Sequence, residues 1–210
     1  MRVLYIDTSS FFLSAGITEN GKLLAEVLEK LEHNLSRDAV KKIADMFLSA
    51  NLTPNDIDKI IVVDGPGSFT GIRVGITIAK IYAYAKNIEI TSISSLDAMS
   101  VSNDNYNYYV PIIDARRGYV YTGVYDKEYR EILEKGHIKL DVLKEKLKDL
   151  DNYLIITNDE IDIDGKKITY KPDILKIVEK YKDKNDINPH SVNPNYLKLT
   201  EAEENLMKNV

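Results

Sequence analysis

The chain has 210 residues, of which 44% are hydrophobic and 29% are charged, and its 28 basic and 33 acidic side chains give a formal net charge of −5. This balance is typical of a globular protein that can bury a core, as one domain or as two small lobes. It argues against a protein that binds nucleic acid without a partner, because contacts of basic side chains with phosphates supply most of the affinity for nucleic acid. The absence of cysteine excludes disulfides and thiolate metal sites.

The start of the chain carries no basic and apolar leader, and the sequence contains no apolar run of about 18 residues. We therefore expect neither secretion nor a membrane span. Together with the lack of cysteine, this favours a cytoplasmic protein.

The first half of the chain predicts three strands, a helix, a strand, a second helix and a strand. Asn20-Gly21 is a tight-turn signal between the second and third strands. Apolar residues at helical spacing indicate the first helix, and Thr70 is the expected N-cap of the second. The expected strands are 2–7, 11–17, 22–30, 59–63 and 89–92, and the expected helices are 36–50 and 72–85.

The second half begins in the same way, so that Asp7 and Asp114 end the first strand of each half. Residues 100–107, rich in Ser, Asn and Asp, are the expected linker between lobes 1–99 and 108–210. The duplicated unit of three strands, helix, strand and helix resembles the actin, hexokinase and Hsp70 class of ATPase folds. The expected elements are strands at 108–114, 119–125, 129–134 and 153–157 and helices at 140–150 and 172–181.

The segment 64–75, DGPGSFTGIRVG, follows an apolar strand and opens the second helix. Such a turn presents backbone N–H groups to an anion, yet this one lacks the lysine of a P-loop and the spacing of a dinucleotide fingerprint. Two interpretations stay open: Gly71 and Gly75 let another backbone approach closely, or the loop cradles a phosphate. The candidate anion or nucleotide contacts are Asp7, Thr8, Ser68, Thr70 and Arg116.

Four motifs occur in an order that resembles the TsaB (YeaZ) family of the Gcp-like, M22 peptidase-like superfamily, and together they cover the whole chain. One departure is that the family usually has His-Ser before its first long helix, where this chain has His33-Asn34. The motifs are the run 65–80, Ile6-Asp7-Thr8-Ser9, the run 111–118, and Pro194-Asn195-Tyr196-Leu197-Lys198 followed by Glu201-Ala202-Glu203.

The resemblance implies an α/β protein with the two-lobed actin-like ATPase (ASKHA, ribonuclease H-like) fold, built from duplicated βββαβα units with a reduced second lobe. It implies a non-catalytic scaffold for TsaD, which transfers threonylcarbamoyl to N6 of A37 in tRNAs reading ANN codons (t6A formation). The implied further partners are the ATPase TsaE, a second copy of the chain when TsaD is absent, and tRNA through the complex. It leaves open whether ATP or ADP binds at the junction with TsaD.

The residues argue against a catalytic site in the isolated chain. The first turn of this fold class wraps ATP phosphates and needs glycine, whereas residues 7–10 read Asp-Thr-Ser-Ser. Arg116 and Arg117 crowd the second turn, where they either pair with acids or hold an anion. The three histidines do not lie one helical turn apart as zinc ligands would, and no Gly-x-Ser-x-Gly elbow is present. We expect no catalytic residue, metal or cofactor; the alternative is a small kinase or ATPase that uses Asp7 and Asp114.

The two long helices of the first half are more apolar than one buried face requires. A helix that is apolar on all sides is buried in its own domain or against a partner. Both interpretations stay open from the residues, and the family resemblance favours an interface with TsaD or a second copy. The candidate interface residues are Ala39, Val40, Ile43, Phe47, Gly71, Arg73, Gly75, Ile76, Ala79, Tyr82 and Ala83.

Overall fold

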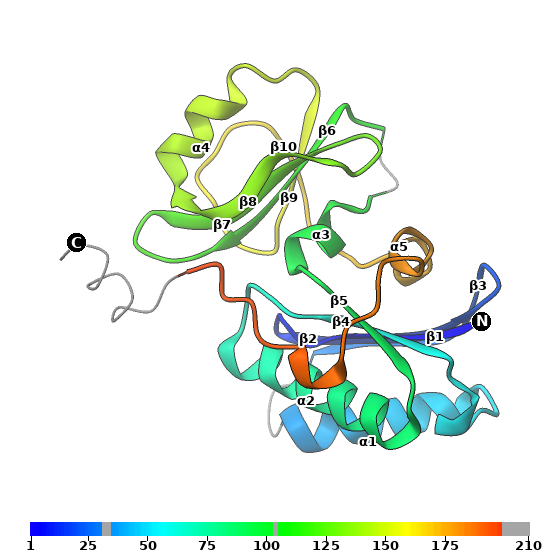
Figure 1. Ribbon diagram of the computed structural model, residues 1–210. Coiled ribbons are helices and arrows are strands. Elements are labelled where there is room, and N and C mark those ends of the chain that lie inside the picture. The colour runs from blue at the N-terminus through cyan, green and yellow to red at the C-terminus, as the bar shows by residue number, and fades with distance from the viewer. Residues whose placement is uncertain (31–34, 103–104, 199–210) are drawn as a thin grey trace. The chain divides into compact units, whose positions relative to one another are not determined.

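The computed structural model describes residues 1–30, 35–102 and 105–198, which form two compact units (Figure 1). Unit 1 comprises Met1–Val101 together with Lys171–Asn195, and unit 2 comprises Ser102–Tyr170 and the tail from Tyr196. Each unit is built on a five-stranded mixed sheet. No helix in the described ranges is long and apolar enough to cross a membrane.

The sheet of unit 1 has the strand order β3-β2-β1-β4-β5. The first three strands are antiparallel, and β4 and β5 run parallel to β1. Asn20 and Gly21, both with positive φ, form the predicted tight turn between β2 and β3. The strands are β1 (Arg2–Asp7), β2 (Phe12–Glu19), β3 (Lys22–Lys30), β4 (Lys59–Val63) and β5 (Glu89–Ile93).

Figure 1 shows α1 and α2 below the sheet of unit 1 and α5 above it. Residues from β1, β2, β4, α1 and α2 form one continuous hydrophobic core. Both faces of β1 are covered, since Leu4, Tyr5 and Ile6 are all fully buried. The helical segments of unit 1 are α1 (Leu35–Ser49), η1 (Pro54–Asp56), α2 (Phe69–Lys86), α3 (Ser95–Ser100), α5 (Ile174–Tyr181) and η2 (Pro189–Ser191).

The N-cap of α2 is Ser68, so the prediction of Thr70 was wrong. The Ser68 hydroxyl accepts a hydrogen bond from the backbone N–H of Gly71 at 3.2 Å. The helix begins at Phe69, three residues earlier than expected, and Thr70 therefore lies inside its first turn. At the other end Asn87 adopts the left-handed conformation that commonly terminates a helix.

Unit 2 repeats the strand arrangement of unit 1, which confirms the predicted duplication. Its order, β10-β9-β6-β7-β8, places β6 at the centre as β1 is in unit 1. Helix α4 follows the third strand, but no second helix separates β9 from β10, so this unit is the reduced one. Its elements are β6 (Tyr108–Asp114), β7 (Tyr119–Asp126), β8 (Glu131–Lys139), α4 (Leu140–Leu147), β9 (Tyr153–Ile156) and β10 (Lys166–Ile168).

Helix α5 belongs with unit 1, although we expected its residues in a second lobe spanning 108–210. Its Ile174 packs on β2 where Gly16 lacks a side chain, and a Cβ there would lie 2.9 Å from Ile174 Cγ2. The chain after α5 continues along unit 1: Ile187 bridges Ile90, and Val192 is buried in the core. Residues 171–195 therefore belong with unit 1 because they pack on it, although they follow unit 2 along the chain.

Gly71 and Gly75 allow close approach, and the approaching segment is the chain's own first turn. A Cβ on Gly71 would overlap the carbonyl oxygen of Thr8, and a Cβ on Gly75 would overlap its hydroxyl. The helix consequently lies directly against the end of β1. This placement answers the question of what the two glycines face.

We expect Gly71→Ala to lower the free energy of unfolding by about 1–3 kcal/mol, because a backbone atom must move to admit the methyl group. Urea denaturation measures this change. Gly136→Ala is the matched control, since no atom lies within 4 Å of a Cβ at that position, and it should stay within about 0.5 kcal/mol of the wild type. Equal stability of the two variants would contradict the close contact.

Candidate functional site

The turn after β1 and the glycine loop before α2 are bonded to each other. The Thr8 hydroxyl donates to the carbonyl oxygen of Gly71 at 2.7 Å, and the backbone N–H of Ser68 donates to the carbonyl of Ser9, also at 2.7 Å. A Cβ on Gly67 would overlap that same carbonyl oxygen. Thr8 and Ser68, both candidate anion contacts, are therefore engaged with the chain's own backbone.

Asp7, the acidic candidate of this turn, points into the protein. Its Oδ1 accepts from the backbone N–H of Ser9 at 2.8 Å, and its Oδ2 accepts from the Tyr5 hydroxyl at 3.4 Å. Burial raises the pKa of Asp7 above its ordinary value, against the opposing effect of these hydrogen bonds. The carboxyl thus stabilises its own turn and is only 6% exposed as a residue.

Asp114 repeats this arrangement in unit 2. Its Oδ1 accepts from the backbone N–H of Arg116 at 2.8 Å, two residues on, as Asp7 does with Ser9. Its own N–H donates to Asp159 Oδ2 at 2.8 Å. Arg116 is exposed in this turn, and the remaining anion candidate, Thr70, lies on α2 in unit 1. The five anion candidates therefore divide between the two units.

The described ranges contain no group of three or more His, Cys, Asp or Glu residues that could hold a metal ion. His137 stacks on the Tyr119 ring, and His190 lies edge-on to the Tyr84 ring. His33, whose role the family comparison left in question, lies outside the described residues. The two described histidines thus contact aromatic rings.

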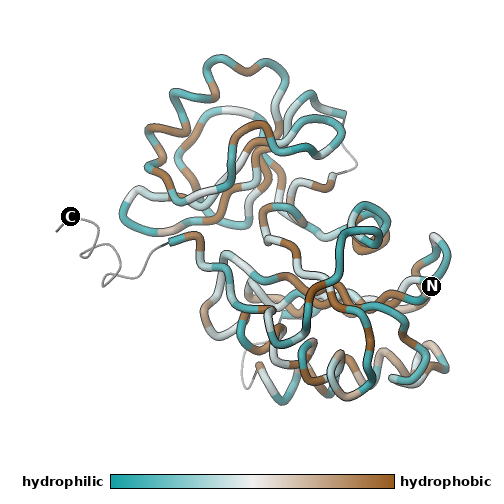
Figure 2. Tube along the Cα trace, in the orientation of Figure 1, coloured by the Kyte–Doolittle hydropathy of each residue, from teal (hydrophilic) through white to brown (hydrophobic). Residues whose placement is uncertain are grey.

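An apolar groove of about 770 Å³ is lined by residues of α1 and α2. Val40 from α1 and Phe69 and Ile81 from α2 line it, and all three are more than half exposed. In Figure 2 hydrophobic residues recur along both helices. The groove is therefore a hydrophobic surface that the fold of unit 1 leaves open.

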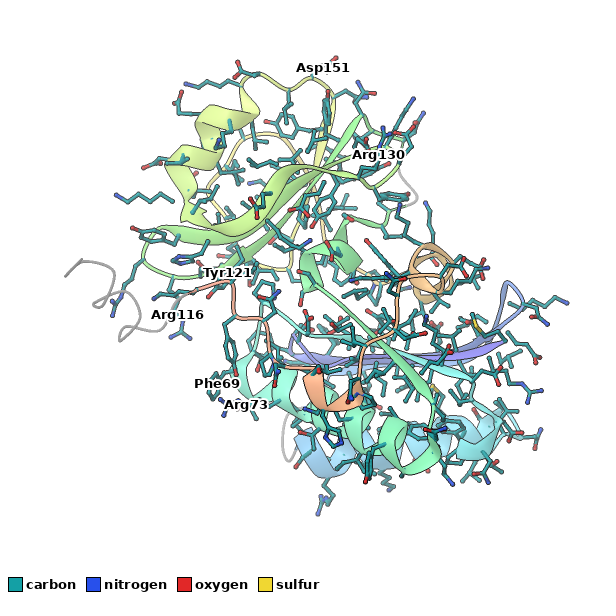
Figure 3. The ribbon with its side chains drawn as sticks, in the orientation of Figure 1. Phe69, Arg73, Arg116, Tyr121, Arg130 and Asp151 are labelled. Carbon is teal, nitrogen blue, oxygen red and sulfur yellow. The ribbon has the colours of Figure 1, made fainter. Side chains whose placement is uncertain are left out.

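Polar contacts fix the rim of the groove. The Arg73 guanidinium lies 3.7 Å from the centre of the Phe69 ring, and Figure 3 shows both side chains at the start of α2. At the far end the Tyr82 hydroxyl donates to the Pro54 carbonyl at 2.6 Å. Burial and the nearby Asp56 raise the pKa of Tyr82 above its ordinary value, so its hydroxyl stays protonated, and able to donate, even in alkaline solution.

Only part of the predicted interface reaches the surface. Val40 and Arg73 are exposed and Tyr82 partly so, whereas the other eight candidates are buried in unit 1. Phe69 and Ile81, which are exposed and line the groove, were not among the candidates, because an apolar helix gives no sign of which apolar stripe meets its own sheet. The eight buried residues, of which Ile43 and Phe47 also line the groove, are Ala39, Ile43, Phe47, Gly71, Gly75, Ile76, Ala79 and Ala83.

Asp7→Asn should raise stability at neutral pH and change its pH dependence. Because the pKa of Asp7 is raised from 3.8, the native state keeps this proton to a higher pH than the unfolded chain does. Stability therefore falls as pH rises from 3.8 through the folded-state pKa, and Asn cannot lose a proton. Urea denaturation across this range should show that the difference in free energy of unfolding between the Asp7→Asn variant and the wild type grows as pH rises. If the two free energies change with pH in parallel, the pKa of Asp7 is not raised.

Comparison with known proteins relates the whole chain to one family. The family described as "TsaD: tRNA N6-adenosine threonylcarbamoyltransferase" matches residues 24–203. The tRNA threonylcarbamoyladenosine biosynthesis protein TsaB of Bacillus subtilis is 30% identical over 97% of this chain and 96% of its own length. TsaB of Escherichia coli is 26% identical over 71% of this chain and 68% of its own.

A solved structure, YeaZ from Pseudomonas aeruginosa, superimposes with a TM-score of 0.77 at 18% identity. The match covers 93% of this chain and 99% of that one. At this identity the likeness establishes the fold, and it confirms the predicted actin-like class.

Proposed function

The chain belongs to the TsaB (YeaZ) family, and on that basis we propose that it serves t6A formation on tRNA as a non-catalytic subunit that binds TsaD. The groove between α1 and α2 carries the proposal, since an open apolar surface of this kind needs cover. Val40, Phe69 and Ile81 are the apolar contacts that a partner would bury.

The match to the TsaD family suggests what fills the groove. Because residues 24–203 of this chain match that family, TsaD should carry a lobe with helices equivalent to α1 and α2. Two such helix pairs can pack face to face, each laying its apolar stripe into the other's groove. A second copy of this chain offers the same surface, so TsaD and self-association should compete for it.

The contacts around the first turn support a non-catalytic role. The backbone of Thr8 and Ser9 lies directly on the loop of Gly67 and Gly71, where a nucleotide-binding turn would leave room for phosphates. Asp7 is buried and bonded to its own turn. We propose that catalysis belongs to TsaD, that TsaE and tRNA join through the assembled complex, and that any ATP or ADP binds where this chain meets TsaD.

Ile81→Glu should weaken association with TsaD by about 10- to 100-fold, because it places an uncompensated charge in an apolar contact. The same change should weaken self-association, measured by light scattering at micromolar concentration. Ile81 is 63% exposed, so the fold should survive. Ile132→Glu in unit 2, also at an exposed isoleucine, is the matched control. Unchanged TsaD binding by the Ile81 variant in a pull-down titration would place the interface elsewhere.

The purified chain should show no steady ATP hydrolysis and should hold no stoichiometric zinc. ATP hydrolysis is not expected because the first turn is closed by its contacts with the glycine loop. Zinc is not expected because the described residues contain no group of three or more His, Cys, Asp or Glu side chains that could hold a metal ion. Phosphate release and metal analysis of the full chain measure both quantities. A turnover that Asp7→Ala abolishes would favour the alternative, a small kinase or ATPase of the same fold.

A further inference from the structure

Three aromatic rings lie together on one face of the β7–β8 ribbon in unit 2. The His137 ring stacks on Tyr119, with centroids 4.7 Å apart and planes inclined by 10°, and the Tyr121 ring lies 5.2 Å from the same histidine. The strand register explains the cluster, since Tyr121 pairs with His137 and Tyr119 is two residues away on the same face. All three side chains are partly exposed.

This face is separate from the core of unit 2. Val120, between the two tyrosines, points to the opposite face and packs in the cluster that contains Leu143 of α4. The rings of Tyr119, Tyr121 and His137 therefore do not supply the packing between the sheet and α4.

Three exposed basic residues are neighbours of the aromatic residues, along the chain or across the two strands. Arg116 and Arg117 form the turn that leads into β7, where the Tyr119 N–H donates to the Arg116 carbonyl at 3.0 Å. Both arginines and Lys139, which pairs with Tyr119 across the strands, are exposed, and within the described residues none of the three forms an ion pair. Figure 3 shows Arg116 and Tyr121 in this region of the unit.

Two carboxylates lie near the turn, and both hold backbone in place. Asp114 accepts from the Arg116 N–H, and Asp159 accepts from the Asp114 N–H. These bonds engage the acidic groups with the backbone of the turn. The guanidinium groups of Arg116 and Arg117 remain available to an anionic partner.

Aromatic rings with arginines beside them have the chemistry that binds single-stranded nucleic acid. Bases stack on aromatic side chains, and guanidinium groups hold phosphates in bidentate contacts. We infer that Tyr119, Tyr121 and His137, with Arg116 and Arg117, form a platform for unpaired RNA bases; resting on the proposed function, that RNA is the tRNA being modified.

The net charge of −5 limits the strength of this contact. Few phosphates can be neutralised by so small a group of cations, so the isolated chain should bind RNA weakly. In the complex with TsaD the platform would add to contacts made by the partner, and linked weak contacts reinforce one another. The platform therefore positions RNA within the assembly.

The test measures binding of an unmodified tRNA transcript to the complex of the full chain with TsaD, by fluorescence anisotropy over a salt series. Tyr119→Leu removes the ring and should weaken binding roughly 5- to 100-fold, while Tyr119→Phe should keep near wild-type affinity. Arg116→Gln with Arg117→Gln should weaken binding and flatten the salt slope by about 1.4, for two phosphate contacts.

Lys146→Gln with Lys166→Gln is the matched control, because it removes the same charge from exposed positions on α4 and β10. It should leave both affinity and salt slope close to wild type. Equal affinities for wild type, Tyr119→Leu and both double variants would overturn the platform.

Co-elution of each variant with TsaD separates this inference from the proposed function. Loss of RNA binding with co-elution intact supports the platform. If the wild-type chain does not associate with TsaD, the proposed function fails, and the same transcript is then titrated with the chain alone at low salt. We expect the RNA affinities of the wild type and the variants to follow the same order in that titration. Equal RNA affinities for all of them would overturn the platform as well.

Discussion

The fold of unit 1 depends on the contact between the turn after β1 and the start of α2. Thr8 donates to the Gly71 carbonyl, and Ser68 donates its N–H to the Ser9 carbonyl. The two backbones lie so close that a single Cβ on Gly67 or Gly71 would overlap an oxygen atom. The Ser68 hydroxyl caps the start of α2 by accepting from the Gly71 N–H, and the glycines allow the close packing.

This contact determines which stripe of α2 is buried. With Gly71 and Gly75 held against Thr8, the residues that follow on the same stripe, Ile76, Ala79 and Ala83, face the sheet. The opposite stripe then has to lie along α1, where it forms the open groove. A helix apolar on all sides is thus explained by two different neighbours, the sheet on one side and a proposed partner on the other.

The two units share one strand order, but the turn after the first strand differs between them. Both sheets have the same strand order, and in each the first strand ends in an aspartate that accepts from the N–H two residues on. In unit 1 the following turn is closed by the glycine loop. In unit 2 the turn carries Arg116 and Arg117 outward beside an aromatic face, which is why we assign the RNA contact there.

The sequence by itself predicted every strand of both sheets except β10, and it predicted the duplication and the spacing of the long helices, because alternation of apolar residues and the Asn20-Gly21 turn are local signals. It gave no sign of β10 or of the short helix α3. It misplaced the cap of α2 by two residues, since both Ser68 and Thr70 are residue types that cap helices, and the structure uses Ser68, whose N–H also bonds the Ser9 carbonyl. The tertiary structure alone decided that α5 joins unit 1 and that Phe69 and Ile81 face outward. Both depend on contacts between residues that lie far apart in the sequence. The identity of an apolar residue does not show whether it packs in its own core or stays exposed.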